Sequence, residues 1–268
     1  MAKCLIAGLP AAGKSTYIGA LAYLLQNPVN NQILKLCETP DDLSYLNKLI
    51  DPWLSLQKME RTTRGFANNI DLELIRVTDS KTFSVSLPDI AGEDYESIVH
   101  QNAEVIKNWT EELDSLLLFI NDWKDSYLKD QLGDTEPANK TKEPPIFSIK
   151  DISTIVQNVL ILKELHILFP WKKLAIGLSS WDKFSKEYTS PVKMLEQRAP
   201  FLHNFVMHYF PDAYIFGVSA QGDEYIEDEE AQSKLLEKTE NGTRAYIVDK
   251  DGVKSYDLTL PLNFLISD

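Results

Sequence analysis

Residues 8–15, Gly-Leu-Pro-Ala-Ala-Gly-Lys-Ser, constrain the fold of this chain more than any other segment. They match the phosphate-binding loop pattern G-x-x-x-x-G-K-[ST] at every fixed position. The apolar run 3–7 precedes them, and residues 15–25 are apolar at helical spacing. A loop between such a strand and helix turns backbone N–H groups toward a phosphate, beside the positive end of the helix dipole. The sequence therefore predicts a nucleotide-binding α/β domain.

Each part of this loop has an expected role in holding a nucleotide. The glycines allow close approach of the backbone, and Lys14 can reach the β- and γ-phosphates. Ser15 can offer its hydroxyl to Mg²⁺. The loop residues expected to bind the nucleotide are Gly8, Pro10, Ala11, Ala12, Gly13, Lys14, Ser15 and Thr16.

Composition excludes several other classes of function. The net charge of −13, from 40 acidic and 27 basic residues, argues against a nucleic-acid groove or an anionic membrane face as the main partner. The two cysteines make neither a disulfide framework nor a zinc site, and Cys4 is expected in the core. No stretch is long and apolar enough for a membrane span, and no secretory signal is present, so we expect a cytoplasmic protein.

Strands alternate with helices along the chain, which predicts a three-layer, doubly wound and mainly parallel α/β sheet. We expect about six strands. One is an antiparallel edge strand, because residues 70–77 and 82–87 both alternate apolar and polar and only residues 78–81 separate them. The other strands are expected at 3–7, 115–120, 173–178 and 213–218, and helices at 15–25, from Thr39 onward, 93–109, 149–168, 191–209 and 224–238.

We expect residues 1–268 to form a single domain with two additions. Residues 124–145 are polar and rich in proline, which predicts a flexible surface insertion. Residues 223–268 predict a C-terminal extension with a helix and a small β-hairpin at 244–248 and 253–257. Residues 249–252 between these strands resemble part of a Ca²⁺ loop but lack its later ligands, so a hairpin turn is favoured.

A second landmark lies at residues 89–92, Asp-Ile-Ala-Gly, which directly follow the expected hairpin. An aspartate at the carboxyl end of a strand beside a phosphate loop can hold a water on Mg²⁺, and we expect this role for Asp89. Gly92, three residues on, can donate its N–H to the γ-phosphate. A lone D-x-x-G is often a turn, but after a hairpin and a complete phosphate loop it favours nucleotide chemistry.

Two further segments lie where a guanine pocket requires them. Asp182 follows the strand expected at 173–178 and can accept two hydrogen bonds, from guanine N1 and N2. The backbone after the strand expected at 213–218 can donate an N–H to guanine O6. The residues expected to bind the base are Ser180, Asp182, Ser219, Ala220 and Gln221.

Taken in order, these motifs resemble those of Ras-like, translation-factor-related P-loop GTPases. Residues 8–15 match the first motif of that class, residues 89–92 the third, and residues 219–221 the fifth, which is usually Ser-Ala-Lys. The fourth motif departs from the family pattern, because Ser179 and Ser180 stand where Asn or Thr and then Lys are usual. That lysine normally packs along the base, and Trp181 is the candidate for a replacement stacking surface.

The resemblance also implies a switch threonine and a catalytic residue. Thr63, or else Thr62, would bind Mg²⁺ and the γ-phosphate together with Ser15 and Asp89. Glu93 stands where Ras-like enzymes usually carry the glutamine that orients the attacking water, which implies slow hydrolysis. For Arg61 and Arg64 two alternatives remain open: one of them acts as an arginine finger in cis, or both are solvated residues of the switch loop. The candidate catalytic residues are Lys14, Glu93, Arg61 and Arg64.

Within this class the chain is similar to bacterial GTPases of the conflict-system or double-GTPase type. These share a small Ras-like core, divergent base-recognition motifs and an ending like residues 258–262, Leu-Thr-Leu-Pro-Leu. The resemblance implies a GTP-binding switch with slow Mg²⁺-dependent hydrolysis and switch loops near 58–69 and 89–100. Its partner would be a protein effector, an activating protein or a second copy of the chain.

Two alternative functions remain open at this point. One is a P-loop small-molecule kinase, although residues 124–145 contain no arginine for the lid that such an enzyme needs. The other is a nucleotide-binding scaffold that hydrolyses almost nothing. Binding and turnover of GTP and ATP, measured side by side, separate the three functions.

Overall fold

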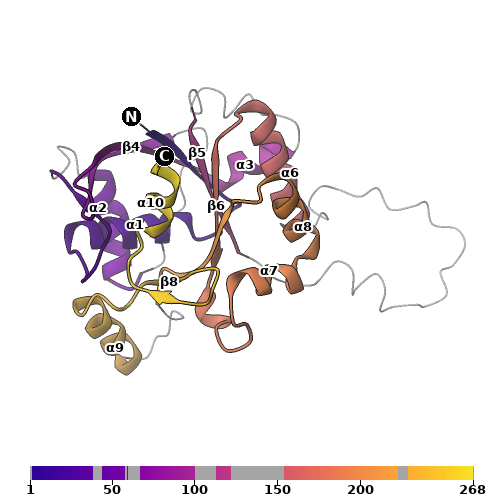
Figure 1. Cartoon of the computed structure of the whole chain (residues 1–268). Coiled ribbons are helices and arrows are strands. Elements are labelled where there is room, and N and C mark those ends of the chain that lie inside the picture. Colours follow the sequence, from indigo (N-terminus) through magenta and orange to yellow (C-terminus); the bar gives the residue numbers. More distant parts are fainter. Residues whose placement is uncertain are drawn as a thin grey trace, which may run out of the picture.

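A computed structural model, shown in Figure 1, describes residues 2–38, 44–57, 59, 67–99, 113–121, 154–222 and 229–267. Several expected features lie outside these ranges. They are the switch residues Arg61, Thr62, Thr63 and Arg64, the insertion at 124–145, the helix start at Thr39, and residues 100–109, 149–153 and 224–228 of three expected helices.

One mixed sheet runs through the molecule in the order β2-β3-β4-β1-β5-β6-β7-β8-β9. Its strands are β1 (Ala2–Ala7), β2 (Leu34–Leu36), β3 (Ala67–Arg76), β4 (Thr82–Ile90), β5 (Ser115–Ile120), β6 (Lys173–Ser179), β7 (Tyr214–Ser219), β8 (Tyr246–Val248) and β9 (Lys254–Ser255). The sheet thus has nine strands in the described chain, and the prediction of about six is wrong. Part of the excess is β2, a strand of 3 residues that is too short for an alternating pattern.

Antiparallel strands flank the parallel centre of the sheet on both sides, so the prediction of one antiparallel edge strand is also wrong. Strands β4, β1, β5, β6 and β7 are parallel neighbours. The expected hairpin is confirmed as β3 and β4, and β2 adds to it in antiparallel register. The expected C-terminal hairpin, β8 and β9, pairs with β7 and extends the same sheet. Its turn is confirmed by the carboxylate of Asp249, which accepts hydrogen bonds from the N–H groups of Asp251 and Val253.

Helices cover both faces of the sheet, as the three-layer prediction requires (Figure 1). On one face lie α1 (Lys14–Gln26), α2 (Ser44–Leu54) and α10 (Leu260–Ile266). On the other lie α3 (Gly92–Val99), α6 (Thr154–Leu168), α7 (Pro191–Arg198) and α8 (Pro200–Tyr209). A further helix, α9 (Glu229–Glu240), precedes β8. Strand β1 shows the physical basis, because Cys4 and Ile6 pack into the first layer while Leu5 and Ala7 pack into the second.

Two helices differ from the sequence prediction. The helix expected at 191–209 is divided into α7 and α8, because Pro200 has no N–H to continue the hydrogen-bond ladder. Ala199, just before it, leaves the helical region with φ −138° and ψ 58°. The other difference is α10, which has no counterpart among the predicted helices. Pro261 lies in its first turn, where a missing N–H is tolerated.

The segment after β9 ties the C-terminus to the first half of the chain. The buried carboxylate of Asp257 accepts hydrogen bonds from the N–H of Ile33 at 2.7 Å and from the hydroxyl of Thr259 at 2.6 Å. Tyr17 of α1 donates its hydroxyl to the carbonyl of Leu258 at 2.7 Å. These bonds hold α10 over the sheet beside α1 and the start of β2.

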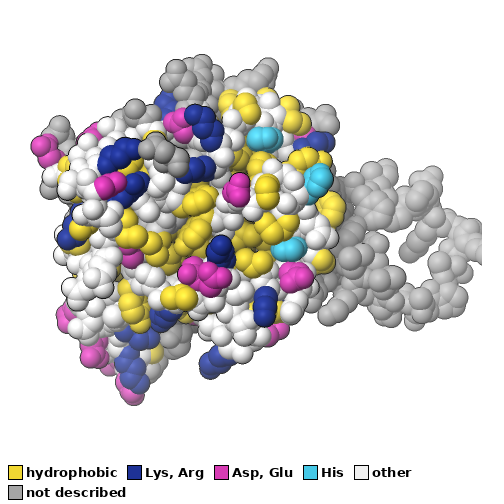
Figure 2. Space-filling view, in the orientation of Figure 1, with side chains coloured by type: hydrophobic (Ala, Val, Ile, Leu, Met, Phe, Trp, Pro, Cys, Tyr) yellow, Lys and Arg dark blue, Asp and Glu magenta, His cyan; other side chains and the backbone are white. Residues whose placement is uncertain are grey.

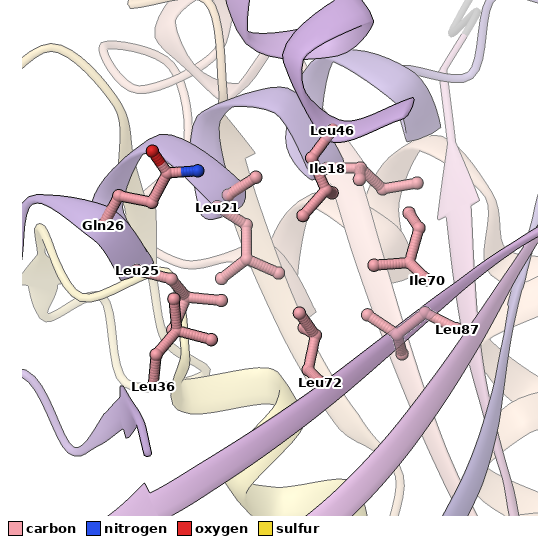
Figure 3. A pocket seen from close by; sticks show the side chains of 10 residues that line it. Ile18, Leu21, Leu25, Gln26, Leu36, Leu46, Ile70, Leu72 and Leu87 are labelled. Atoms are coloured by element: carbon pink, nitrogen blue, oxygen red, sulfur yellow. The ribbon is translucent and has the colours of Figure 1, made fainter. Parts of the chain in front are cut away.

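The apolar layer beneath α1 and α2 is nearly filled. Figure 3 shows Leu21 and Leu25 of α1 and Leu46 of α2 facing Leu72 and Leu87 of the β3–β4 hairpin. The space left among these side chains is about 10 Å³. That is room for at most one water in an apolar setting, so this space is part of the packed core.

The surface over α6 and α8 carries exposed apolar side chains. Figure 2 shows hydrophobic groups and histidines together on this part of the molecule. Ile167, Phe201 and Tyr209 are each more than half exposed there. Within the described ranges no helix has the length and apolar character needed to cross a membrane.

Candidate nucleotide-binding site

The carboxyl ends of the parallel strands bring the sequence motifs to one edge of the sheet. Strand β1 lies between β4 and β5, so the strand order reverses there and the loop at residues 8–13 emerges from the reversal point. In doubly wound sheets, ligands bind at such a point. Residues 91–92 follow β4, Asn121 follows β5, and residues 180–183 and 220–222 follow β6 and β7.

The loop at residues 8–13 folds tightly before α1 begins. The N–H of Ala12 donates to the carbonyl of Leu9 at 3.1 Å. Ala11 and Gly13 have positive φ angles of 60° and 93°, which turn the backbone through the left-handed region. Ser15 is half-buried in the first turn of α1. The loop therefore delivers its backbone to the N-terminus of α1, where a phosphate would meet N–H groups and the helix dipole.

Lys14 lies almost fully buried against this loop. Its Nζ donates to the carbonyl of Gly8 at 2.7 Å and lies 5.6 Å from the centre of the Tyr95 ring. Burial lowers the pKa of the Lys14 ammonium to about 8, while the nearby carboxylates of Asp89 and Glu93 act in the opposite direction. Lys14 thus connects the first motif, through its hydrogen bond to Gly8, with the third motif, through its electrostatic interaction with Asp89.

The third motif packs directly on the first. Asp89 is fully buried near the end of β4, and its carboxylate accepts a hydrogen bond from the hydroxyl of Tyr45 on α2. Gly92 begins α3, and a Cβ at this position would lie 2.4 Å from the backbone nitrogen of Pro10. Only glycine permits this approach. Glu93 follows in the first turn of α3, where its charge suits the helix dipole.

A cavity of about 390 Å³ lies beside the loop. Its lining comes from Asn121 after β5 and from the first, fourth and fifth motifs with their neighbours, and consists of Ala11, Gly13, Thr16, Asn121, Ser179, Ser180, Asp182, Lys183, Val218, Ala220 and Gln221. Of the expected base-binding residues, Ser180, Asp182, Ala220 and Gln221 line it directly. Ser219 does not line the cavity itself but holds the Asp182 side chain, because its hydroxyl donates a hydrogen bond to Asp182 Oδ1 at 2.6 Å. The two segments expected to recognise a base therefore touch each other.

Trp181 does not line this cavity, and the expectation that it stacks on a base is wrong. It is 2% exposed, and its indole occupies the space where a side chain at Gly217 of β7 would be. Ser180 has a left-handed backbone, φ 57° and ψ 38°, just before the short 3₁₀ turn Trp181–Lys183. Burial of its large apolar surface places Trp181 in the core, while the carboxylate of Asp182 stays at the cavity.

Asn121 and Lys183 belong to the site although the sequence did not predict them there, and Ser179 of the fourth motif has a contact that the sequence did not predict. Ser179 donates its hydroxyl to the carbonyl of Ala12 at 2.6 Å, and Asn121 donates its amide to the carbonyl of Ala11 at 3.1 Å. Lys183 lines the cavity beside Asp182. A signal for two of them was available, because Asn121 and Ser179 are polar positions at the ends of apolar parallel strands, and such ends meet at one edge.

The donors at the phosphate side fit Mg²⁺. This ion binds through one or two carboxylates together with phosphate oxygens and waters. The carboxylate of Asp89 and the hydroxyl of Ser15 are hard oxygen donors of that kind. In the part of the chain that the structure describes, no cluster of three or more His, Cys, Asp or Glu side chains forms a metal cage. A metal here would therefore depend on the nucleotide for much of its coordination.

A family model described as Double-GTPase 1 matches residues 5–265. The chain belongs to the Double-GTPase 1 family. The match runs from β1 to α10 and so includes every motif of the site. Membership confirms the resemblance to the double-GTPase type and supports a GTP-binding protein. A search of curated proteins found no match.

Solved structures of nucleotide-bound proteins are also similar to this member of the Double-GTPase 1 family. One is Methanosarcina barkeri Roco2 RocCORdC bound to GDP, with 15% identity over 95% of this chain and 51% of that chain and a TM-score of 0.36. Another is the S. cerevisiae Ski7 GTPase-like domain bound to GTP, with 19% identity, 90% and 50% coverage and a TM-score of 0.45. The SRb-GTP/SRX complex of the signal recognition particle receptor from Chaetomium thermophilum has 13% identity, 88% and 98% coverage and a TM-score of 0.45. The chain spans about half the length of the first two.

Proposed function

We propose that this chain binds GTP and GDP with Mg²⁺ and acts as a regulatory switch that hydrolyses GTP slowly. One observation carries the proposal: the loop at residues 8–15 packs against Gly92 of the Asp89–Gly92 turn and also lines the cavity beside Asp182 through Ala11 and Gly13. A site with a phosphate end and a base end is what a nucleoside triphosphate requires. The volume of about 390 Å³ lies within the ordinary range of ligand pockets.

Asp182 is proposed to select guanine. Its carboxylate can accept hydrogen bonds from both N1 and N2 of guanine, whereas adenine would leave it unpaired. The hydroxyl of Ser219 holds the carboxylate in place at the cavity wall. Backbone N–H groups of the Ser219–Gln221 segment are proposed to meet guanine O6. A site built on such bonds discriminates strongly against the wrong base.

Lys14, Ser15 and Asp89 are proposed to serve the phosphate end. The buried ammonium of Lys14 supplies positive charge to the phosphates, and the amides at the start of α1 add donors. Ser15 and Asp89 would hold Mg²⁺, together with Thr63 from the proposed switch loop at 58–69. When bound, the ion neutralises charge that develops on the phosphates.

Slow hydrolysis is proposed from the chemistry of Glu93. It follows Gly92 in the first turn of α3 and interacts electrostatically with Lys14. A glutamate can accept a proton from water, but it cannot donate to the γ-phosphate as glutamine does, and it adds negative charge where charge develops. Arg61 or Arg64 is proposed to offset this charge in cis. A protein partner or a second copy would complete the site at the switch loops.

Equilibrium binding and turnover with GTP and ATP, each with Mg²⁺, test this function. We expect GTP to bind at least about a hundredfold more tightly than ATP and to be hydrolysed far below the ~1–100 s⁻¹ of kinases. Equal affinity for the two nucleotides would favour a kinase. Tight GTP binding with no measurable hydrolysis at any protein concentration would favour a scaffold.

A further inference from the structure

Two buried donors hold the loop after β7 from behind the cavity. The indole Nε1–H of Trp53 donates to the carbonyl of Ala220 at 2.8 Å. The Nε–H of Arg244 donates to the carbonyl of Gln221 at 2.9 Å. Both side chains are only 1% exposed. They come from α2 and from the segment before β8, so two distant parts of the chain converge on two consecutive peptide groups.

The two donors form one unit, the Trp53–Arg244 pair. The guanidinium carbon of Arg244 lies 4.0 Å from the centre of a Trp53 ring, which is a close cation–π contact. Arg244 also approaches the hydroxyl of Thr239 on α9 at 3.4 Å. Burying a guanidinium is unfavourable unless its N–H groups are used. An apolar side chain would fill the same space without that cost, so the directed hydrogen bonds point to a role beyond packing.

The pair controls which way the loop peptides face. In a trans peptide the C=O and the following N–H point in opposite directions. Anchoring the carbonyls of Ala220 and Gln221 therefore directs the N–H groups of Gln221 and Gly222 away from the anchors. Gly222 has a φ of 91°, and a Cβ there would lie 2.6 Å from the carbonyl oxygen of Arg244. The loop thus rests directly on the Arg244 backbone while Ala220 and Gln221 line the cavity.

We infer that Trp53 and Arg244 are positioning residues that set the preference for guanine over adenine. The inference rests on the proposed guanine site. Guanine presents an acceptor at O6, whereas adenine presents the N6 amino donor at the same place. A loop peptide that turned over would offer a carbonyl to the cavity in place of an N–H and would accept adenine. The two anchored carbonyls prevent that rotation.

The experiment measures dissociation constants for GTP and ATP with Mg²⁺ on the full chain and two conservative variants. Trp53→Phe keeps an aromatic face beneath Arg244 but removes the indole donor. Arg244→Lys keeps the charge but removes the Nε–H donor. We expect each variant to lose about tenfold in GTP affinity, the effect of one well-placed hydrogen bond. ATP affinity should stay level or rise, so the GTP-over-ATP ratio falls about tenfold or more.

Arg76→Lys is the matched control. Arg76 also ties the C-terminal segment to the sheet, through Asn263 at 2.8 Å and Ser267 at 2.9 Å, but neither partner lines the cavity. Arg76→Lys should lower the melting temperature, as Arg244→Lys does, and should leave the ratio of GTP affinity to ATP affinity unchanged.

The results distinguish a failure of the positioning role of Trp53 and Arg244 from a failure of the proposed guanine site. Equal losses of GTP and ATP affinity in folded Trp53→Phe protein, or no loss, would show that the pair serves stability alone and would overturn the inference. If Arg244→Lys does not fold, the Trp53→Phe ratio decides. If the unmodified chain itself shows no preference for GTP, the proposed guanine site fails, whatever the variants do.

Discussion

The proposed phosphate end and the proposed base end of the site are built in different ways. The phosphate end takes most of its groups from one contiguous segment, residues 8–15, and uses backbone conformation above all. The base end assembles Asp182, the loop after β7 and the Trp53–Arg244 pair from separate parts of the chain. A site made of backbone depends on a short run of residues whose conformations bring the N–H groups together. At the proposed base end, residues 179–182 depart from the family pattern, and side chains from distant segments support the loop after β7.

The two ends nevertheless share supports. Ser179 belongs to the fourth motif, yet its hydroxyl binds the carbonyl of Ala12 in the phosphate loop. Helix α2 contacts both ends, with Tyr45 at Asp89 and Trp53 at Ala220. Because residues 45, 49 and 53 lie on one stripe of a helix, a single element touches the proposed metal side and the loop after β7. We therefore expect some substitutions to affect one end of the site and others to affect both ends.

Lys14→Ala should give the largest effect, at the phosphate end. Removing the buried ammonium leaves the phosphate charge uncompensated, and we expect GTP and GDP affinity to fall by about a thousandfold or more. The measurement is equilibrium titration with a fluorescent guanine nucleotide, with the melting temperature recorded to confirm folding. Lys186→Ala, at an exposed lysine that does not line the cavity, is the matched control and should have a minor effect. Retained tight binding in Lys14→Ala would remove the loop at residues 8–15 from the site.

Asp182→Asn should give the next largest effect, confined to the base end. The amide exchanges two accepted hydrogen bonds for a mismatched donor, so GTP affinity should fall about a hundredfold. Xanthosine triphosphate, which carries an oxygen at position 2, should gain affinity. Competition titrations with the two nucleotides check this, and Asp212→Asn on the exposed surface serves as the control. An unchanged ratio of the two affinities would mean that Asp182 does not contact the base.

Ser179→Ala tests how the two ends are connected, because Ser179 lines the cavity and also donates a hydrogen bond to Ala12 of the phosphate loop. Loss of the hydrogen bond to Ala12 should loosen the phosphate loop and weaken binding about tenfold. GTP and ATP should weaken equally, since both carry the same phosphates. Ser55→Ala, at an exposed position, is the control. A change in the GTP-over-ATP ratio would instead place the main role of Ser179 at the base.

Glu93→Gln should give the smallest effect, on rate and not on affinity. Glutamine restores a donor toward the γ-phosphate and removes a negative charge, so single-turnover hydrolysis should rise about threefold to tenfold. The assay uses saturating GTP over a series of protein concentrations, with the exposed Glu196→Gln as the control. Fast hydrolysis that is independent of protein concentration and insensitive to Glu93 would contradict the proposed catalytic chemistry.

Local patterns predicted much of the fold where one segment carried its own signal. Strand β5 lies at residues 115–120 as expected, because a continuous apolar run indicates a strand buried on both faces. The β3–β4 hairpin follows from alternation and a short turn. Weak local signals failed. The three residues of β2 owe their place to the longer partner β3, and the pairing of β8 with β7 joins segments whose connection includes a helix.

The sequence by itself determined the phosphate loop and the Asp89–Gly92 turn, because the chemistry of each lies within a few consecutive residues. Tertiary structure alone decided that Trp181 belongs to the core, that Ser179 supports the loop at residues 8–13, and that Trp53 and Arg244 hold the loop after β7. The reason is physical. A short backbone turn depends on its own residues, whereas the partner of a buried donor or indole depends on which distant segments the sheet order brings together.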